Sequence, residues 1–503
     1  MIDKLKKYLN DHPISGLLVI ALIPRLVAVL FSKGYGMHDD HFLIIEAAQS
    51  WVNGYDYNDW LPKDPLTSGA TGHSWFYVGM HYFYFEFMEL IGFSDPQGKM
   101  YLIRLGHALY SLLMIPPVYF IVKKAAHHKV ALQAGLLMAL LWSFPILSVR
   151  NLVEMVCIPP VLWATWILYK NENYPIKNVI YAGLLCGFAM AFRFHIILFI
   201  GGFGLVLLGQ KKIIGGAVFG VAAFVALFLT QLGDLVIWGR PFVELQEYIA
   251  YNLSNTTSYF NRPWYQYFGT IGGLMLPPLS LLLMLGYFKS FKKHLLLFLP
   301  SFVFFAFHCY FPNKQERFIL PVIPFVIALG CVGWNEITEK NKQKWIRNLN
   351  KFSWRFFWAV NTIALLIVSP AYSKKSRVDA MEYLGQLPDY NGFVVEYTIE
   401  YDAPLMPRYY ANNWSSIYYL TKETNEEEYG RNIHALNDAE RPRYALFFEN
   451  TKLEARKRKF EHLFNSKLEG LTQIEPSYLD KLLHAMNPNN SNETAYIYKI
   501  NYQ

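Results

Sequence analysis

The run I-S-G-L-L-V-I-A-L-I-P-R-L-V-A-V-L-F at residues 14–31 establishes the class of fold, because it is apolar enough to cross a bilayer. A membrane-crossing helix needs about 20 mostly apolar residues. Lys4, Lys6 and Lys7 precede the run, and no small-residue cleavage site follows it. It is also too long for the apolar core of a removable signal peptide. We therefore predict a retained first membrane helix.

Ten further apolar segments predict an α-helical polytopic membrane protein with about eleven transmembrane helices. The composition agrees, because 53% of the 503 residues are hydrophobic and only 17% are charged, against about 45–50% and about 25% in soluble domains. The four cysteines all lie inside apolar runs, which argues against a disulfide framework and against a cysteine zinc site. The further segments are 101–122, 131–149, 153–169, 178–192, 194–209, 213–232, 269–288, 294–311, 317–334 and 353–370.

Basic residues cluster in alternate connections between these segments, as the positive-inside rule predicts for cytoplasmic loops. The net charge of +8 is therefore a signal of topology, and we expect no nucleic-acid partner. With a cytoplasmic N-terminus, the opposite side receives residues 32–100, 149–153, 193, 233–268 and 312–317, and the chain after residue 371.

The composition changes after residue 370, where the charge rises and helix-like segments alternate with strand-like ones. About 130 residues suffice for one small domain. We predict a transmembrane module over residues 1–370, with a first extracytoplasmic loop at 32–100, and a soluble extracytoplasmic α/β domain over 371–503. The predicted helices are 376–387, 453–464 and 478–486, and the predicted strands are 392–397, 443–448 and 494–500.

The stretch H-D-D-H-F-L-I-I-E, just past the first predicted helix, carries the most reactive side chains of this loop. Asp39 and Asp40, flanked by His38 and His41, are suited to act as a general base. The same set of oxygen and nitrogen atoms is also suited to bind a metal. Glu46 points the same way if the segment is helical. The alternative is a solvated acidic loop.

Cations occur in three other extracytoplasmic places. Lys314 and Arg317 lie three residues apart and suit a phosphate at headgroup depth, or they anchor a helix end by snorkelling. Arg262 and Trp264 suit a lipid phosphate and a sugar ring, or they belong to an aromatic belt. Arg193 lies in apolar sequence, where a charge costs about 2.5–3.5 kcal/mol unless it pairs or lines a cavity.

The predicted topology brings these groups to one face of the membrane. Arg150 reaches that face too, although its spacing from Glu154 equally predicts a local helical ion pair. Independent structural anchors would scatter to both faces, so the convergence favours a single site.

These motifs resemble those of the C-type (GT-C) membrane glycosyltransferases, and more narrowly of the mannosyltransferases that extend glycosylphosphatidylinositol anchors and dolichol-linked oligosaccharides. The resemblance covers residues 14–335. The family's H-P-D-E-like motif stands here as H-D-D-H at 38–41, followed by Glu46. Its P-H-K-E-x-R-F motif stands as P-N-K-Q-E-R-F at 312–318. Its D-x-x-x-Y-G motif and the P-W-x-x-Y-F element that follows stand at 234–239 and 263–268.

This sequence departs from the family pattern at positions that bear on its chemistry. His41 stands where the family has an acid, Asn313 replaces a histidine and Gln315 replaces a glutamate. A change of donor, acceptor or proton handling is compatible with these departures.

The resemblance implies an inverting transfer of mannose from a polyprenyl-phosphate donor to a hydroxyl of a glycolipid or lipid-linked glycan. Asp40 would be the general base, with Asp39 and then Glu46 as the next candidates. No metal is required, although His38, Asp40 and His41 leave a divalent ion open. The residues implied in donor binding, with the developing phosphate charge stabilised by the cations, are His38, Arg193, Arg262, Trp264, Lys314 and Arg317.

Three alternatives stay open. One is transfer of another lipid-linked sugar, such as aminoarabinose or glucose, or transfer to protein hydroxyls. Another is a transporter of lipid-linked sugars, although the charges gather at one surface and no internal repeat is visible. The third is a relative that only binds lipid. We expect a bacterial cytoplasmic membrane with a periplasmic site, or alternatively an endoplasmic reticulum membrane with a lumenal one.

Overall fold

The computed structural model describes the whole chain except residues 1, 64–69, 71–73, 259–260, 342 and 489–493. The chain divides into two compact units, each assembled from separate stretches of sequence. We call them the helical unit, residues 1–30, 59–80 and 103–370, and the sheet unit, residues 31–58, 81–102 and 371–503.

Five helical stretches of the described chain are long and apolar enough to cross a membrane, and six shorter apolar helices accompany them. Each overlaps one of the predicted segments. The five stretches are α2 (Pro13–Phe31), α6 with α7 (Pro96–Ser111 and Ile115–Ala125), α14 with α15 (Ile213–Thr230 and Leu232–Ile237), η4 with α20 (Glu316–Val322 and Ile323–Lys340) and α21 (Lys344–Val368). The shorter ones are α8 (His128–Leu140), α10 with α11 (Val153–Val156 and Ile158–Tyr169), α12 (Ile176–Phe192), η3 with α13 (Phe194–Ile196 and Ile197–Gly209), α18 (Leu279–Lys289) and α19 (Leu295–Tyr310).

Two predicted segments are not continuous helices. The segment 269–288 is divided into α17 (Gln266–Leu274) and α18, because Pro277 and Pro278 between them provide no backbone N–H donor. The segment 131–149 ends as α8 at Leu140 and resumes only as the short α9 (Phe144–Leu147).

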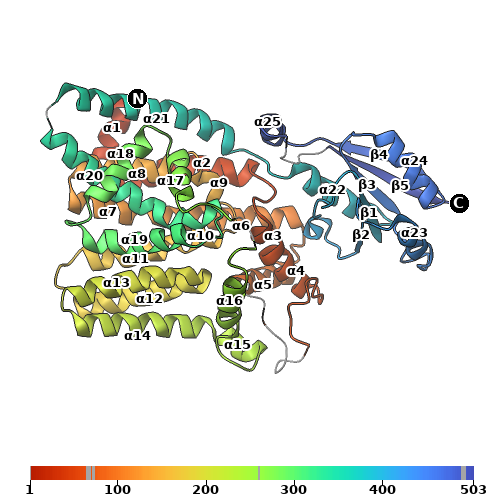
Figure 1. The fold of residues 1–503 in the computed structure, drawn as a ribbon, viewed down its shortest axis with the longest axis horizontal. Coiled ribbons are helices and arrows are strands. Elements are labelled where there is room, and N and C mark those ends of the chain that lie inside the picture. The colour runs from red at the N-terminus through yellow and green to blue at the C-terminus, as the bar shows by residue number, and fades with distance from the viewer. Residues whose placement is uncertain (1, 64–69, 71–73, 259–260, 342, 489–493) are drawn as a thin grey trace. The chain divides into compact units, whose positions relative to one another are not determined.

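Small residues allow the helices of this unit to approach closely. Gly183 and Gly187 of α12 face α14, and a β-carbon at Gly187 would lie 2.1 Å from the carbonyl oxygen of Ala223. Figure 1 shows α12, α13 and α14 side by side. Membrane helices lack a hydrophobic drive toward one another, so such close backbone packing holds them together.

Arg25 is a charge inside the first apolar helix, and the fold satisfies it locally. Its Nε donates to Ser111 Oγ at 2.8 Å, and its Nη1 donates to the carbonyls of Ala21 and Ala139, each at 3.0 Å. Burial of an unpaired guanidinium at this depth would be costly. These bonds therefore fix how α2 lies against α6 and α8.

The sheet unit contains a five-stranded sheet of order β2-β1-β3-β5-β4. Strands β2, β1 and β3 are parallel, whereas β5 runs antiparallel to β3 and to β4. The central strands β1 and β3 are buried along their whole length, as strands covered on both faces are. The strands are β1 (Gly392–Tyr397), β2 (Ser416–Thr421), β3 (Tyr444–Phe448), β4 (Ser466–Ile474) and β5 (Ala495–Tyr502), and the accompanying helices are α22 (Lys375–Gly385), α23 (Glu426–His434), α24 (Leu453–Leu463) and α25 (Tyr478–Met486).

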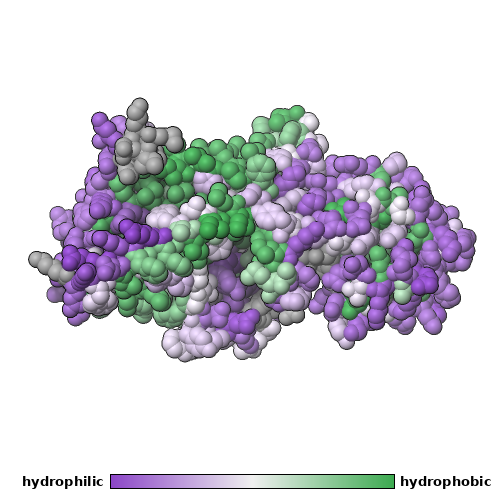
Figure 2. Space-filling view, turned by 90° about the horizontal axis from the view of Figure 1, so that it is seen from above, coloured by the Kyte–Doolittle hydropathy of each residue, from purple (hydrophilic) through white to green (hydrophobic). Residues whose placement is uncertain are grey.

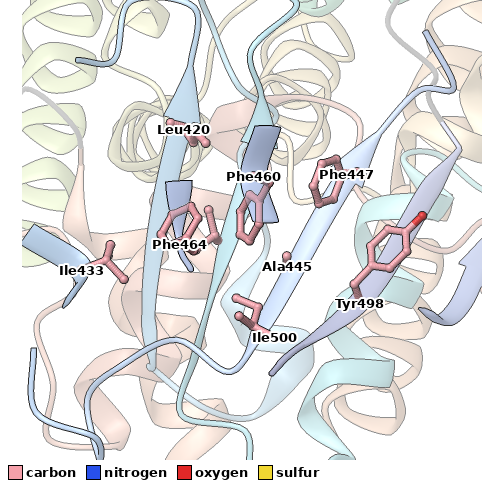
Figure 3. Close-up of a cluster of buried hydrophobic side chains, with 9 residues drawn as sticks. Leu420, Ile433, Ala445, Phe447, Phe460, Phe464, Tyr498 and Ile500 are labelled. Carbon is pink, nitrogen blue, oxygen red and sulfur yellow. The ribbon is translucent and has the colours of Figure 1, made fainter. Parts of the chain in front are cut away.

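Helices α23 and α24 cover one face of this sheet with an apolar core. Phe460 of α24 and Phe464, which directly follows that helix, stack at 4.2 Å, and Ile433 of α23 lies beside them (Figure 3). The strands contribute Val394, Leu420, Ala445, Phe447, Tyr498 and Ile500. Figure 2 shows that the visible surface of the sheet-bearing part is mostly hydrophilic, whereas hydrophobic side chains gather over the helical part.

The first part of the loop after the first helix, residues 31–58, belongs to the sheet unit, whereas residues 59–80 belong to the helical unit. The backbone at Gly34 forms a parallel bridge with Ser373, and Ser373 N donates to Lys33 O at 3.1 Å. Ser32 Oγ donates to Ala371 O at 2.9 Å. Residues 32–34 are therefore bonded to residues 371–373, although Ser32 and Ala371 are 339 positions apart in the sequence.

Candidate active site

The predicted acidic motif folds as three short helical turns in the sheet unit: α3 (His38–His41), a π-helical turn η1 (Phe42–Glu46) and α4 (Ala47–Val52). A π-helical turn is rare and occurs often at functional sites. Its wider turn changes the direction in which the side chains of the motif point. The segment is helical, which is the condition under which Glu46 was expected to point the same way as the acid pair.

Asp40 and Asp39 differ in exposure and in what holds them. Asp40 is 3% exposed, and its two carboxylate oxygens accept hydrogen bonds from Met37 N at 2.9 Å and Gly36 N at 3.1 Å. Asp39 is half-buried. Two backbone donors orient the Asp40 carboxylate in a fixed direction, as a positioned base requires.

His41 and Glu46 lie in the interior of the sheet unit. The His41 ring stacks between Tyr35 and Tyr410, with centroid distances of 4.8 and 5.4 Å. Its Nε2 lies 3.2 Å from Glu46 Oε1, which also accepts from Tyr409 N at 3.1 Å. Glu46 therefore joins the acidic motif to the segment around Tyr409. His38, by contrast, is exposed and stacks on Phe42.

The cations lie in the helical unit, centred on a carboxylate. Arg193 follows the last residue of α12 with an extended backbone, and its Nη1 binds Glu154 Oε1 at 2.7 Å. Arg317 Nε lies 3.5 Å from the same oxygen and donates to Gln315 Oε1 at 2.9 Å. The Phe318 ring lies under both guanidiniums, 4.6 Å from Arg193 and 5.6 Å from Arg317.

This cluster leaves donor groups for a ligand. Within the described residues, Arg193 Nε and Nη2 are buried without a hydrogen-bond partner. Lys314 Nζ donates to the carbonyl of Phe311, and burial lowers the pKa of its ammonium. One carboxylate between two guanidiniums and a nearby ammonium leaves a net positive site, which suits an anion such as a phosphate.

Arg262 and Trp264 are joined to this cluster through the backbone. Arg262 N donates to Pro312 O at 3.2 Å, and Asn261 forms an antiparallel bridge with Asn313. Two predicted motifs far apart in sequence therefore run side by side. The Arg262 side chain is exposed, and Trp264 is 65% exposed.

The predicted D-x-x-x-W-G motif places a second buried carboxylate in the helical unit. Asp234 lies beside Glu244 of α16 (Val243–Ser254), whose backbone N is 3.4 Å from Asp234 Oδ2. Glu244 Oε2 accepts from Trp75 N at 2.8 Å. Burial, and then the charge of Asp234, raise the pKa of Glu244 well above its ordinary value, so this carboxyl holds a proton between the two groups.

The site includes residues that the sequence did not single out. His195 Nε2 lies 3.0 Å from Tyr248 OH, and the His195 ring meets His308 edge-on at 5.0 Å. The indication in the sequence was the charge of Arg193, which His195 follows by two positions. Glu154, which the sequence placed only beside Arg150, binds Arg193 and Arg317.

The predicted site residues thus form two groups, each within its own unit. The acids and His38 belong to the sheet unit, and the cations and Trp264 belong to the helical unit. Among the described residues, no group of three or more histidine, cysteine, aspartate or glutamate side chains is placed to hold a metal ion.

Comparison with known proteins identifies the family. The profile of the Alg9-like mannosyltransferase family matches residues 17–399, which is well over half of the chain. The chain belongs to the Alg9-like mannosyltransferase family. It is a GT-C glycosyltransferase of the mannosyltransferase type, as the motifs predict. The mannosyltransferase APTG1 of Arabidopsis thaliana is 22% identical to it over 387 residues, which cover 72% of this chain and 68% of that protein.

Solved structures agree with an Alg9-like chain at the level of the fold. The structure of ArnT from Cupriavidus metallidurans bound to undecaprenyl phosphate matches with a TM-score of 0.59 and 12% identity, covering 96% of this chain and 97% of ArnT. The structure of the oligosaccharyltransferase AglB from Archaeoglobus fulgidus, in complex with an inhibitory peptide and a dolichol-phosphate, matches with a TM-score of 0.54 and 12% identity, covering 91% and 71%. The prediction of a helical GT-C membrane enzyme with a small C-terminal sheet domain is confirmed.

Proposed function

We propose that this chain transfers mannose, with inversion, from a polyprenyl-phosphate donor to a hydroxyl of a glycolipid or lipid-linked glycan. The observation that carries the proposal is the buried Arg193–Glu154–Arg317 cluster with its remaining guanidinium donors, in a chain of a mannosyltransferase family. ArnT was solved with undecaprenyl phosphate and AglB with a dolichol-phosphate, which supports a polyprenyl phosphate as the donor class.

The proposed reaction needs one base and one anion site. Asp40 takes the proton of the acceptor hydroxyl, and the oxygen attacks the anomeric carbon from the side opposite the phosphate. The bond between that carbon and the phosphate oxygen breaks, and polyprenyl phosphate leaves with the electron pair. Asp39, which is half-buried, is the second candidate for the base, and Glu46 positions the motif through its bonds to His41 and Tyr409.

The cations act on the leaving group. Arg193, Arg317 and Lys314 stabilise the charge that develops on the phosphate, which is where preorganised donors contribute most. Arg262 and Trp264 lie on the segment paired with residues 312–313, where they contact the lipid phosphate or the sugar of the donor. His38, on the acid side, contacts the bound substrate.

The proposed topology follows the positive-inside pattern. Residues 1–370 form a transmembrane module of eleven spans with a cytoplasmic N-terminus, and residues 371–503 form an extracytoplasmic domain. Transfer then takes place on the non-cytoplasmic face. We place the enzyme in a bacterial cytoplasmic membrane with a periplasmic site, the alternative being the endoplasmic reticulum with a lumenal site.

A transfer assay tests the proposal. Purified protein in detergent receives polyprenyl-phosphate mannose and a lipid extract from its own host, and mannose incorporation is measured for the wild type, Asp40→Asn and Asp59→Asn. General base catalysis contributes about 10²–10⁴-fold, so Asp40→Asn should lose roughly that factor. Asp59 has an 81% exposed side chain, and its variant should behave as the wild type.

Each other outcome has a defined meaning. Equal incorporation by the wild type and Asp40→Asn moves the base to Asp39. No incorporation by the wild type rejects mannose as the sugar. Other lipid-linked sugars would then be tested, and after them transport of lipid-linked sugars.

A further inference from the structure

A cavity of about 290 Å³ lies entirely within the sheet unit, beside the acidic motif. One wall is the backbone of residues 36–38, and the others come from the start of α22 and from residues 402–405. Its volume is at the lower end of ligand pockets, which begin at about 300 Å³. A polar headgroup fits such a space, whereas a polyprenyl chain does not.

The charged lining of this cavity is predominantly basic. Lys374 and Arg377 line it together with His38, against one acid, Asp402. The Arg377 guanidinium lies against the phenol of Tyr35, whose pKa burial raises to about 12, so the hydroxyl stays protonated at neutral pH. The cavity is therefore lined by two cations and by a phenol whose hydroxyl donates to Leu405 O at 3.4 Å.

The two cations occupy an electrostatically unfavourable place in the fold. They lie at the N-terminal end of α22, where the helix dipole repels positive charge. Lys374 also has a φ of +54°, in the left-handed region that disfavours a lysine. The neighbouring Lys375 does not line the cavity, and it pairs with Asp379 at 2.8 Å. A bound anion would offset the repulsion at Lys374 and Arg377.

The cavity adjoins the proposed base through shared backbone. Gly36 and Met37 line it, and their N–H groups are the ones that bind the Asp40 carboxylate. The lining residue His38 lies one position from Asp39 and two from Asp40 along the chain, so a molecule held there by an anionic group lies close to both in sequence. The acceptor, and not the donor, is the substrate whose hydroxyl must reach that carboxylate.

We propose that this cavity binds a phosphate group of the acceptor headgroup through Lys374 and Arg377. The inference rests on the proposed function and specifies its acceptor: a polyol that carries a phosphate near the hydroxyl to be mannosylated. The donor phosphate is bound separately, in the helical unit.

The experiment compares two soluble acceptor analogues, methyl α-mannoside 6-phosphate and methyl α-mannoside, as inhibitors of the transfer reaction. The proteins are the wild type, Lys374→Asn, Arg377→Gln and the control Lys375→Asn. Asparagine removes the charge and tolerates a positive φ, so Lys374→Asn should fold. An unchanged thermal unfolding midpoint confirms this for each variant.

Losing one charge-assisted hydrogen bond weakens binding by roughly 10- to 100-fold. We expect the wild type to bind the phosphorylated analogue more tightly than the neutral one by at least that factor. Lys374→Asn and Arg377→Gln should lose this preference, with the inhibition by methyl α-mannoside and the KM of the donor unchanged. Lys375→Asn should keep it.

Three results would overturn the inference: equal inhibition of the wild type by both analogues, loss of the preference in Lys375→Asn, or a matching rise in the KM of the donor. If the wild type transfers no mannose at all, the proposed function fails on its own. Calorimetric titration of both analogues then tests whether the cavity binds a phosphate. Tighter binding of the phosphorylated analogue supports the inference, and equal binding or no binding rejects it.

Discussion

Replacing Arg193 by glutamine removes one of the two guanidiniums that lie against Glu154 in the helical unit. Its Nη1 is occupied by Glu154 at 2.7 Å, whereas Nε and Nη2 have no partner among the described residues. The proposed donor phosphate therefore gains up to two hydrogen bonds from this side chain. A glutamine supplies neither the charge nor the planar pair of donors.

The size of the effect follows from those two bonds. A hydrogen bond to a charged group contributes about 1.5–3 kcal/mol, so two are worth about 3–6 kcal/mol, or roughly 10²–10⁴-fold. We expect Arg193→Gln to lower kcat/KM for polyprenyl-phosphate mannose by that factor. Arg193→Lys should lose about half of this interaction free energy with the donor phosphate, because the ammonium keeps the charge but is a single compact donor.

Folding must be separated from function in this test. Breaking a buried ion pair costs about 3–5 kcal/mol when one charge is left behind. Arg317, 3.5 Å from Glu154, still balances part of the charge of that carboxylate, so the loss in the free energy of unfolding should be smaller than this range. The double variant Arg193→Gln/Glu154→Gln removes the stranded carboxylate and should recover stability without recovering activity. Arg347→Gln, on the exposed surface of α21, is the matched control.

The assay measures initial rates against donor concentration, together with thermal unfolding of each variant in the same detergent. An Arg193→Gln enzyme within threefold of the wild type would refute the reasoning. So would a variant whose defect lies only in the KM of the acceptor, because Arg193 would then not serve the donor.

Three further outcomes follow from the packing and the charges. Gly187→Leu should destabilise the protein by about 1–3 kcal/mol or more, since its β-carbon would overlap the α14 backbone. The control Gly201→Ala, whose β-carbon would enter open space, should leave stability unchanged. The thermal unfolding midpoints of the two variants test this expectation. Arg456→Met leaves the buried Glu396 carboxylate without its ion-pair partner and should lower the free energy of unfolding by about 3–5 kcal/mol. The unfolding midpoint measures this, and an unchanged midpoint would contradict the burial of the pair. The raised pKa of Glu244 means that the folded state holds a proton which the unfolded state releases near pH 4.3, so stability from this group falls as pH rises above that value. The slope of unfolding midpoint against pH should flatten in Glu244→Gln, and an unchanged slope would place its origin elsewhere.

The sequence predicted those elements whose pattern is strong along the chain. The predicted strand 392–397 is β1, and 443–448 and 494–500 correspond to β3 and β5, because these segments are rich in the apolar and aromatic residues that strands favour. Strands β2 and β4 were missed. Both lie at the edges of the sheet and are largely exposed or half-buried, so they lack the apolar alternation that reveals a strand.

The site shows the same limit. The motifs predicted Asp40 and Arg317 as site residues, because the spacing and composition that point to them are local. The partners of Glu154 could not be predicted, since Arg193 lies 39 positions away and only tertiary folding brings the two together. The stacking of His41 between Tyr35 and Tyr410 is invisible in sequence for the same reason.

The bonds that tie residues 32–34 and Glu46 to the segments around Ser373 and Tyr409 have a consequence for how such enzymes diverge. Two stretches separated by most of the chain hold each other in place and must therefore change together. Exchange of the tail alone between relatives would break the bonds that hold the acidic motif, and exchange of the loop alone would strand the tail. A working chimera must therefore carry both stretches from the same parent, together with residues 81–102, which also bond to the tail.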